Sequence, residues 1–291
     1  MPQTLTILAP AKVNWYLELR GKRPDGYHEI ETVMQAIDLF DRITVQDAPA
    51  LTLACNINLG PVESNLVYRA ADPLRREHAP GRGAPITLEK RIPHGAGLGG
   101  GSSDAAAVMV ALDRLWGLQL GNDRLRQLVA RIGSDCAFFV EGGTALCTGR
   151  GEIVRQLPDF AGVDVVILYP NVVLPTKDVY ADYASHLTAQ PAKCYFSNEI
   201  NISLNRDWLR AHTTNRLQDS ALRISEPLRT VWEQTRNEQG VVVRLVSGAG
   251  SALAFAVEDR YTSEALVQSF TGRGLGQAFA TRSIGRGAVW D

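Results

Sequence analysis

PHGAGLGGGSSDAAA, residues 93–107, is the stretch that decides how this 291-residue sequence is interpreted. Five of its glycines fall within seven residues and lead directly into a helical run. Glycine has no side chain to keep an anion away from backbone N–H groups, and a helix start adds unpaired donors and a positive dipole end. The stretch therefore predicts a phosphate-binding loop, made by Pro93, Gly95, Gly97, Gly99, Gly100, Gly101, Ser102 and Ser103.

The loop alone does not decide which phosphate compound binds, and a flexible turn is the simplest alternative. A Walker A loop needs Gly-Lys-Ser/Thr, but Gly101 precedes Ser102 with no lysine. The G-x-G-x-x-G spacing is present, yet a dinucleotide fold would need a strand after the helix, and residues 122–132 are helical in pattern instead. The catalytic-loop signature of protein kinases is absent as well.

The pattern around the loop predicts an α+β fold. Alternation and turn residues predict strands at residues 5–8, 13–19, 43–46, 51–54, 86–90, 163–169, 241–246 and 252–257. Residues 9–11 should interrupt the first two, and residues 20–27 should form a loop. Helices are expected at 65–76, capped by Ser64, from Ser102 onward, and at 122–132. We expect two domains, 1–160 and 161–291, with an insertion at 185–205.

Composition excludes several classes of protein. The net charge of −1 does not fit a strongly basic nucleic-acid binder, and no apolar run is long enough to cross a membrane. No secretory signal is visible, so a cytoplasmic location is expected. The four cysteines lack zinc-like or redox spacing and are expected to be reduced and mostly buried, with no structural metal site.

Four further segments accompany the loop: APAKVN at 9–14, RPDGYHEIE at 23–31, GSDCAFF at 133–139 and SGAGS at 247–251. In this order and spacing, the sequence resembles the GHMP small-molecule kinases. The resemblance implies two domains, an N-terminal one with the glycine loop and a smaller ferredoxin-like C-terminal one, with the active site between them. It also implies ATP, with Mg²⁺ carried by the nucleotide.

Two residues match catalytic positions of that family. Asp135 matches the catalytic aspartate, which accepts a proton from the alcohol as its oxygen attacks phosphorus. Lys12 matches a lysine that would keep this carboxylate ionised and offset charge on the transferring group. Without the resemblance, Asp135 is equally well a turn or helix cap, and Lys12 is better explained as a solvated strand residue.

Other residues match binding positions. The resemblance places Asn14, Tyr27 and His28 at a cytidine group, since amide and imidazole groups supply donors and acceptors for a pyrimidine edge. It places Tyr180 against the base and Gly248, in SGAGS, beside the substrate phosphates; core packing and a plain hairpin turn are the alternatives. Asn65 and Lys90 match residues near the adenine and the loop. Asn215-Arg216-Leu217 departs from the Asn-Asp-Leu that relatives often have.

The resemblance is closest to members that phosphorylate the tertiary 2-hydroxyl of a methylerythritol linked to cytidine diphosphate, a step of non-mevalonate isoprenoid biosynthesis. Two other hypotheses stay open. The chain could be another GHMP kinase, of the homoserine or mevalonate type, which the DGYH segment argues against. It could also be a non-catalytic ligand sensor on the same fold, for which Lys12 and Asp135 would both be unnecessary.

Overall fold

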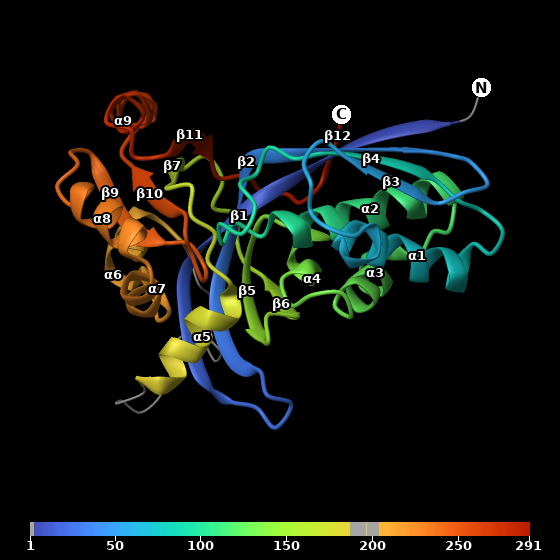
Figure 1. The fold of residues 1–291 in the computed structure, drawn as a ribbon, viewed down its shortest axis with the longest axis horizontal. Helices are drawn as coiled ribbons and strands as arrows, with labels where there is room; N and C mark the ends of the chain where they lie inside the picture. Colours follow the sequence, from blue (N-terminus) through green and yellow to red (C-terminus); the bar gives the residue numbers. More distant parts are fainter. Residues whose placement is uncertain (1–2, 187–195, 197–203) are drawn as a thin grey trace.

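The computed structural model describes residues 3–186, 196 and 204–291, and it contains two β-sheets with helices packed on them (Figure 1). The first sheet has the strands β1 (Thr4–Lys22), β2 (His28–Gln46), β3 (Thr52–Cys55), β4 (Pro85–Glu89), β5 (Thr144–Gly149), β6 (Ile153–Gln156), β8 (Thr214–Asn215) and β12 (Val289–Trp290). The second sheet has β7 (Asp164–Tyr169), β9 (Val241–Val246), β10 (Leu253–Val257) and β11 (Gln277–Arg282). The α+β class is confirmed.

The long β1–β2 hairpin is the central feature of the first sheet (blue in Figure 1). The predicted interruption at residues 9–11 is wrong, because β1 continues through Pro10 with a register shift between Pro10 and Ala11. A bulge tolerates a residue that lacks an N–H group, so the strand bends there and does not end. The predicted loop is also too long: β1 extends to Lys22, and β2 begins at His28.

Helices cover one face of the first sheet (Figure 1). They are η1 (Val62–Ser64), α1 (Leu66–His78), α2 (Gly100–Trp116), α3 (Gly121–Val129) and α4 (Cys136–Phe139). Helix α2 packs on β1, β2 and α1, and its Ala105, Ala106 and Ala107 are fully buried because small side chains permit close approach. It starts two residues before the predicted Ser102.

The cap of α1 differs from the prediction. Ser64 ends a short 3₁₀ helix, and its hydroxyl donates to the carbonyl of Pro61 at 2.7 Å. Asn65 has the extended backbone of a cap residue, and its Oδ1 accepts the N–H of Val67 at 2.9 Å. The 3₁₀ turn therefore moves the helix start one residue further along than the sequence pattern indicated.

The second sheet is antiparallel with the order β11-β7-β10-β9. The connections carry α5 (Thr176–Ser185), α6 (Arg206–His212), α7 (Gln218–Ile224), α8 (Glu226–Gln234) and α9 (Arg260–Gly272). Helices follow β7 and β10, so the unit has the β-α-β-β-α-β pattern of a ferredoxin-like fold. The strands predicted at 163–169, 241–246 and 252–257 are confirmed within one residue.

The two sheets share strands and core. Strands β8 and β12 lie beyond the second sheet's first strand in sequence, yet both pair with β1. One apolar cluster joins Val13 and Trp15 of the first sheet to Val165 and Ile167 of the second. The division into 1–160 and 161–291 therefore stays a prediction. Residues 187–195 and 197–203 of the expected insertion lie outside the described residues.

The cysteines that the structure describes are free. Cys136 and Cys147 are buried and Cys55 is half-buried, as expected for reduced core residues. Burial raises the pKa of the Cys136 thiol to about 12, so this side chain, next to Asp135 in sequence, is a protonated packing group at neutral pH. Cys194 lies outside the described residues.

Candidate active site

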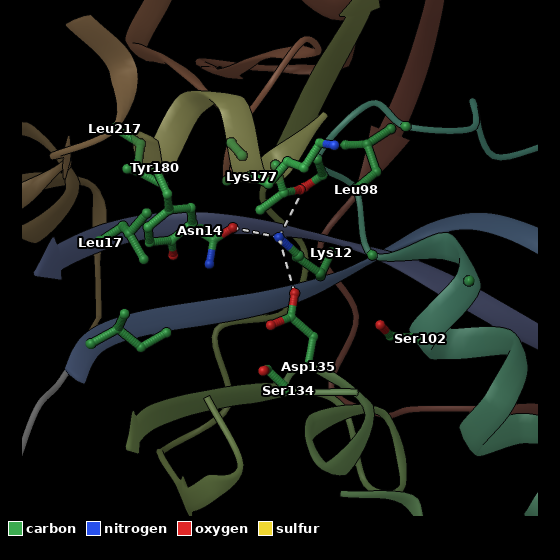
Figure 2. Close-up of a pocket in the computed structure, with 18 of the residues that line it drawn as sticks. Lys12, Asn14, Leu17, Leu98, Ser102, Ser134, Asp135, Lys177, Tyr180 and Leu217 are labelled. Atoms are coloured by element: carbon green, nitrogen blue, oxygen red, sulfur yellow. Dashed lines mark hydrogen bonds and ion pairs between the residues drawn. The ribbon is translucent and has the colours of Figure 1, made fainter. Parts of the chain in front are cut away.

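A cavity of about 810 Å³ opens between the glycine loop, the β1–β2 hairpin and helix α5 (Figure 2). The sequence-predicted residues that line it are Lys12, Asn14, Tyr27, His28, Lys90, Pro93, Gly95, Gly97, Gly99, Gly100, Gly101, Ser102, Asp135, Tyr180 and Gly248. Asn65 and Ser103 are not part of the lining. Asn65 caps α1 beside the lining residue Leu66, and the Ser103 hydroxyl is buried with no hydrogen-bond partner among the described residues.

The glycine loop is held against the turn between β9 and β10. The hydroxyl of Ser247 donates to the carbonyl of Gly97 at 3.1 Å, and the N–H of Ala252 donates to the carbonyl of Ala96 at 3.0 Å. Gly97 has φ +77°, and a Cβ atom there would lie 2.0 Å from the carbonyl oxygen of Ser247. This contact requires glycine, because both the backbone conformation and the space exclude a side chain.

Lys12 and Asp135 meet at the centre of the cavity (Figure 2). The Lys12 Nζ lies 3.6 Å from Asp135 Oδ2 and donates to Asn14 Oδ1 at 2.6 Å and to the carbonyl of Gly97 at 2.9 Å. Lys12 is 3% exposed, whereas the Asp135 side chain is 29% exposed toward the cavity. A fixed ammonium therefore stands beside an accessible carboxylate at the glycine loop.

Burial lowers the pKa of Lys12 from its ordinary value of 10.5, and the neighbouring Asp135 opposes that change. Asn14, two residues further along β1, holds the Lys12 ammonium in place by accepting its hydrogen bond. Asn14 Nδ2 donates to Thr32 Oγ1 at 2.8 Å, and Thr32 donates to the carbonyl of Tyr16 at 2.6 Å. Among the described residues, the Asn14 amide therefore has two side-chain partners, Lys12 and Thr32, and its second N–H has none.

Aromatic side chains form the other end of the cavity. The rings of His28 and Tyr180 are 5.2 Å apart, and Tyr183 lies edge-on to His28 at 6.2 Å. Burial, and then the charge of Lys22, lowers the pKa of His28 from 6.5, so its neutral ring offers one donor and one acceptor at pH 7. Tyr27 is 52% exposed, and the Arg150 guanidinium lies 4.8 Å from its ring centroid.

Lys90 lines the cavity and also has two buried protein partners, so its predicted contact with the nucleotide stays a prediction. Its ammonium is buried between the carboxylates of Asp41 and Asp104, the latter at 2.7 Å. Asp41 also accepts the N–H groups of Arg91 and Ile92, at 2.6 and 2.9 Å. A Cβ at Gly100 would lie 3.1 Å from Lys90 Nζ, so this cluster lies directly behind the loop and fixes the chain that enters it.

Arg216, which departs from the family pattern, does not disturb the cavity, because the neighbouring Asn215 holds the SGAGS turn. The Nδ2 of Asn215 donates to the carbonyls of Val246 and Gly248, both at 2.7 Å, and so holds the SGAGS turn in place. The neighbouring Arg216 instead pairs with Glu18, with Nε 2.6 Å from Oε1. The departure from the family pattern therefore concerns a side chain bonded to β1, whereas Asn215 and the lining residue Leu217 keep their places at the site.

Sequence reasoning missed several cavity residues. Lys177 and Arg150 line the cavity, Thr32 orients Asn14, and Asp41 and Asp104 hold Lys90. The only available signals were single charged residues in PTKD and TGRGE, which are too short to indicate a site. Contacts across the sheet, such as that of Lys90 with Asp41, have no local sequence pattern at all.

The described part of the chain shows neither a metal-binding cluster nor a membrane-spanning helix. It contains no group of three or more His, Cys, Asp or Glu side chains that could hold a metal ion. It also contains no helix that is long and apolar enough to span a membrane.

Comparisons with known proteins identify relatives of this sequence and of this fold. The sequence model of the GHMP kinases N terminal domain matches residues 65–143, which include the whole glycine loop. A crystal structure of a 4-(cytidine 5'-diphospho)-2C-methyl-D-erythritol kinase superposes with a TM-score of 0.79 at 33% identity, over 96% of this chain and 99% of that one. A homoserine kinase from Cytophaga hutchinsonii, with a TM-score of 0.71 and 16% identity over 99% and 97%, shows the same fold.

Curated relatives are more specific. A 4-diphosphocytidyl-2-C-methyl-D-erythritol kinase of Synechococcus sp. (strain JA-3-3Ab) is 45% identical over 64% of this chain, which spans 62% of that relative's length. One from Nostoc punctiforme is 33% identical over 98% of both chains. Fold and glycine loop thus define the class as the GHMP kinases. Within that class, the chain belongs to the family of 4-diphosphocytidyl-2-C-methyl-D-erythritol kinases.

Proposed function

We propose that this protein transfers the γ-phosphoryl group of ATP to the 2-hydroxyl of 4-diphosphocytidyl-2-C-methyl-D-erythritol, in cytoplasmic non-mevalonate isoprenoid biosynthesis. Curated relatives that align over nearly the whole chain carry the name of this kinase. The observation that carries the proposal is the Lys12–Asp135 pair, 3.6 Å apart, which lies beside the glycine loop in a cavity of about 810 Å³.

The chemical step needs a base, an electrophile and a stabilised leaving group. In the proposed mechanism Asp135 accepts the proton of the 2-hydroxyl as its oxygen bonds to the γ-phosphorus. The bond to the β–γ bridging oxygen breaks, and ADP leaves with that electron pair. The Lys12 ammonium is already fixed by Asn14 and Gly97, so it offsets charge on the transferring group without rearranging.

The loop and the start of α2 supply the donors for the nucleotide phosphates. Residues 97–102 line the cavity and contain the start of α2, whose Gly99 cap has no side chain to satisfy the first N–H groups, so unpaired donors and the positive end of the helix dipole lie at this wall. Magnesium carried by the nucleotide would neutralise phosphate charge. The lining side chains with oxygens that would suit this ion include Ser102, Ser134 and Asp135, and Asp135 is open to the cavity.

The aromatic end of the cavity suits the cytidine group. The Tyr180 ring, beside that of His28, offers a stacking surface, and the neutral His28 and the free N–H of Asn14 offer hydrogen bonds to a base edge. A ligand without the base would leave these groups unpaired. Sites of this kind reject such analogues by about 10⁴–10⁵-fold.

A kinase assay with four acceptors tests the proposal. The full chain is given ATP and magnesium with the cytidine diphosphate-linked methylerythritol, methylerythritol phosphate, homoserine or mevalonate. We expect kcat/KM to be about 10⁴-fold higher for the first acceptor. Equal values for the first two would show that no base is read, and preference for homoserine or mevalonate would make this another GHMP kinase. Binding without turnover of any acceptor would make it a sensor.

A further inference from the structure

The cavity contains a cation that has no role so far. The ammonium groups of Lys12 and Lys90 both bind protein partners. Lys12 contacts Asp135, Asn14 and Gly97, and Lys90 pairs with two buried carboxylates. Lys177 lines the same cavity, and its side chain is exposed. Its ammonium has no hydrogen bond or ion pair with any residue that the structure describes.

The position of Lys177 relates it to both ends of the cavity. Four residues before it, Val173 packs on the glycine loop, where a Cβ at Gly95 would lie 2.6 Å from Val173 Cγ1. Three residues after it on the same face of α5, the Tyr180 ring packs 5.2 Å from His28. Lys177 therefore lies between the loop and the aromatic end. In Figure 2, Lys177 and Asp135 enter the cavity from opposite sides, with Lys12 between them.

We propose that Lys177 contacts the γ-phosphoryl group of bound ATP and stabilises it during transfer, a role that rests on the proposed function above. The group that moves from ATP to the acceptor must occupy the space between the glycine loop and Asp135, and Lys177 is the lining cation of α5 beside that space. Charge on the three peripheral oxygens of the γ-phosphoryl group is what catalysis of this step must stabilise.

The chemistry of the side chain fits this position. A lysine ammonium is a compact point charge on a flexible stem, so it can follow phosphorus as the group moves by a few ångström between oxygens. Because Lys177 has no protein partner among the described residues, no existing hydrogen bond must break before it binds phosphate. The catalytic site would then be completed by a helix of the second sheet's unit.

Nucleotide binding tests the contact independently of turnover. Calorimetry with ATP and with ADP, each with magnesium and without acceptor, is run on the wild type, Lys177→Ala and Arg229→Ala. Arg229 is an exposed residue of α8, and its replacement removes the same charge outside the cavity. We expect Lys177→Ala to raise the Kd for ATP about 10–100-fold and to change that for ADP less than threefold. Arg229→Ala should change neither.

Kinetics give the second measurement. With thermal melting confirming a normal fold, Lys177→Ala should lower kcat about 10²–10³-fold, and Lys177→Arg should restore part of the loss. Equal weakening of ATP and ADP, an unchanged Kd for ATP, or the same effect in Arg229→Ala would overturn the assignment. If the wild type fails to phosphorylate the cytidine-linked acceptor, the proposed function fails, while the ATP–ADP contrast still decides the role of Lys177.

Discussion

The glycine-loop side of the cavity and its α5 side hold their polar residues in opposite ways. On the loop side, Lys12 and Lys90 are buried and each bonds two or three protein groups. On the other side, Tyr27 is 52% exposed and Lys177 is open to the cavity. The buried cations behind and beside the glycine loop are thus fixed by protein partners, whereas the open side chains of the hairpin and α5, Lys177 included, are left for a ligand to order.

This contrast predicts how substitutions divide. A preorganised side contributes to the rate because its dipoles and charges need no rearrangement in the transition state. A side that the ligand orders contributes to affinity, reduced by the cost of ordering its side chains. Changes on the loop side should therefore lower kcat or stability, and changes at the aromatic end should mainly raise the KM for the acceptor.

The largest effect is expected from Asp135→Asn. The amide keeps the shape of the carboxylate but cannot accept the proton, so kcat should fall about 10²–10⁴-fold. ATP affinity and the melting temperature should stay close to those of the wild type. Asp123→Asn, which changes a carboxylate that is 88% exposed on α3, serves as the control with normal kcat. Near-normal turnover in Asp135→Asn would remove the base from the mechanism.

A smaller but still large effect is expected from Gly97→Ala. A left-handed backbone costs about 1–2 kcal/mol for alanine, and the contact with the Ser247 carbonyl adds to that cost. We expect the free energy of unfolding to fall by about 3 kcal/mol. Gly101→Ala is the matched change, because a Cβ there meets only Leu66 at 3.4 Å inside α2. It should keep or slightly raise stability in denaturant titrations, and equal losses would contradict the fixed-loop interpretation.

At the aromatic end, His28→Ala should raise the KM for the acceptor about tenfold and leave the KM for ATP unchanged. The substitution removes a donor and an acceptor that the base would use. His28→Gln, whose amide supplies both, should recover part of the affinity. Steady-state kinetics with each substrate varied in turn measure both KM values. A rise confined to the KM for ATP would show that His28 contacts the nucleotide and not the acceptor.

The smallest effect concerns pH. Lys12 acts as an ammonium, and burial lowers its pKa from 10.5, so its charge is lost as pH rises through a value below 10.5. The alkaline limb of kcat/KM should therefore lie below that pH. In Lys12→Arg the limb should move upward, because arginine stays protonated throughout this range. An unmoved limb would assign the titration to another group.

The sequence predicted what local patterns determine. The glycine loop and three of the four ferredoxin-like strands were predicted from residue types and spacing, whereas β11, β5 and β6 were not. The resemblance linked Lys12 to Asp135 across more than a hundred residues. The pair proved to lie 3.6 Å apart. Their roles, like those of the other site residues, remain predictions for the experiments above.

What the sequence did not predict depends on contacts in three dimensions. In the sequence, Pro10 predicts the end of a strand. In the structure it lies at a bulge that forms only when β1 pairs with β2, and no local pattern indicates that pairing. The ion pair of Lys90 with Asp41 had no sequence signal because the two residues are 49 positions apart. Ser64 suggested a cap because the short 3₁₀ helix before Asn65 has no sequence signature of its own. Lys177 is a single charge on a short helix, which no periodicity distinguishes from a solvated residue.

The partners of β1 also bear on how this chain folds. Tyr16 pairs with Thr214, and Leu8 pairs with Val289. The first strand therefore cannot complete its pairing until segments much later in the sequence have been synthesised. Contacts this distant in sequence slow folding, since the entropy of closing long loops is lost before the contacts form. Trp15, fully buried in the cluster shared with the second sheet, has no cover until that sheet assembles. Unfolding of the two sheets should accordingly be one cooperative event, and a chain cut after residue 160 would expose an apolar face prone to aggregation.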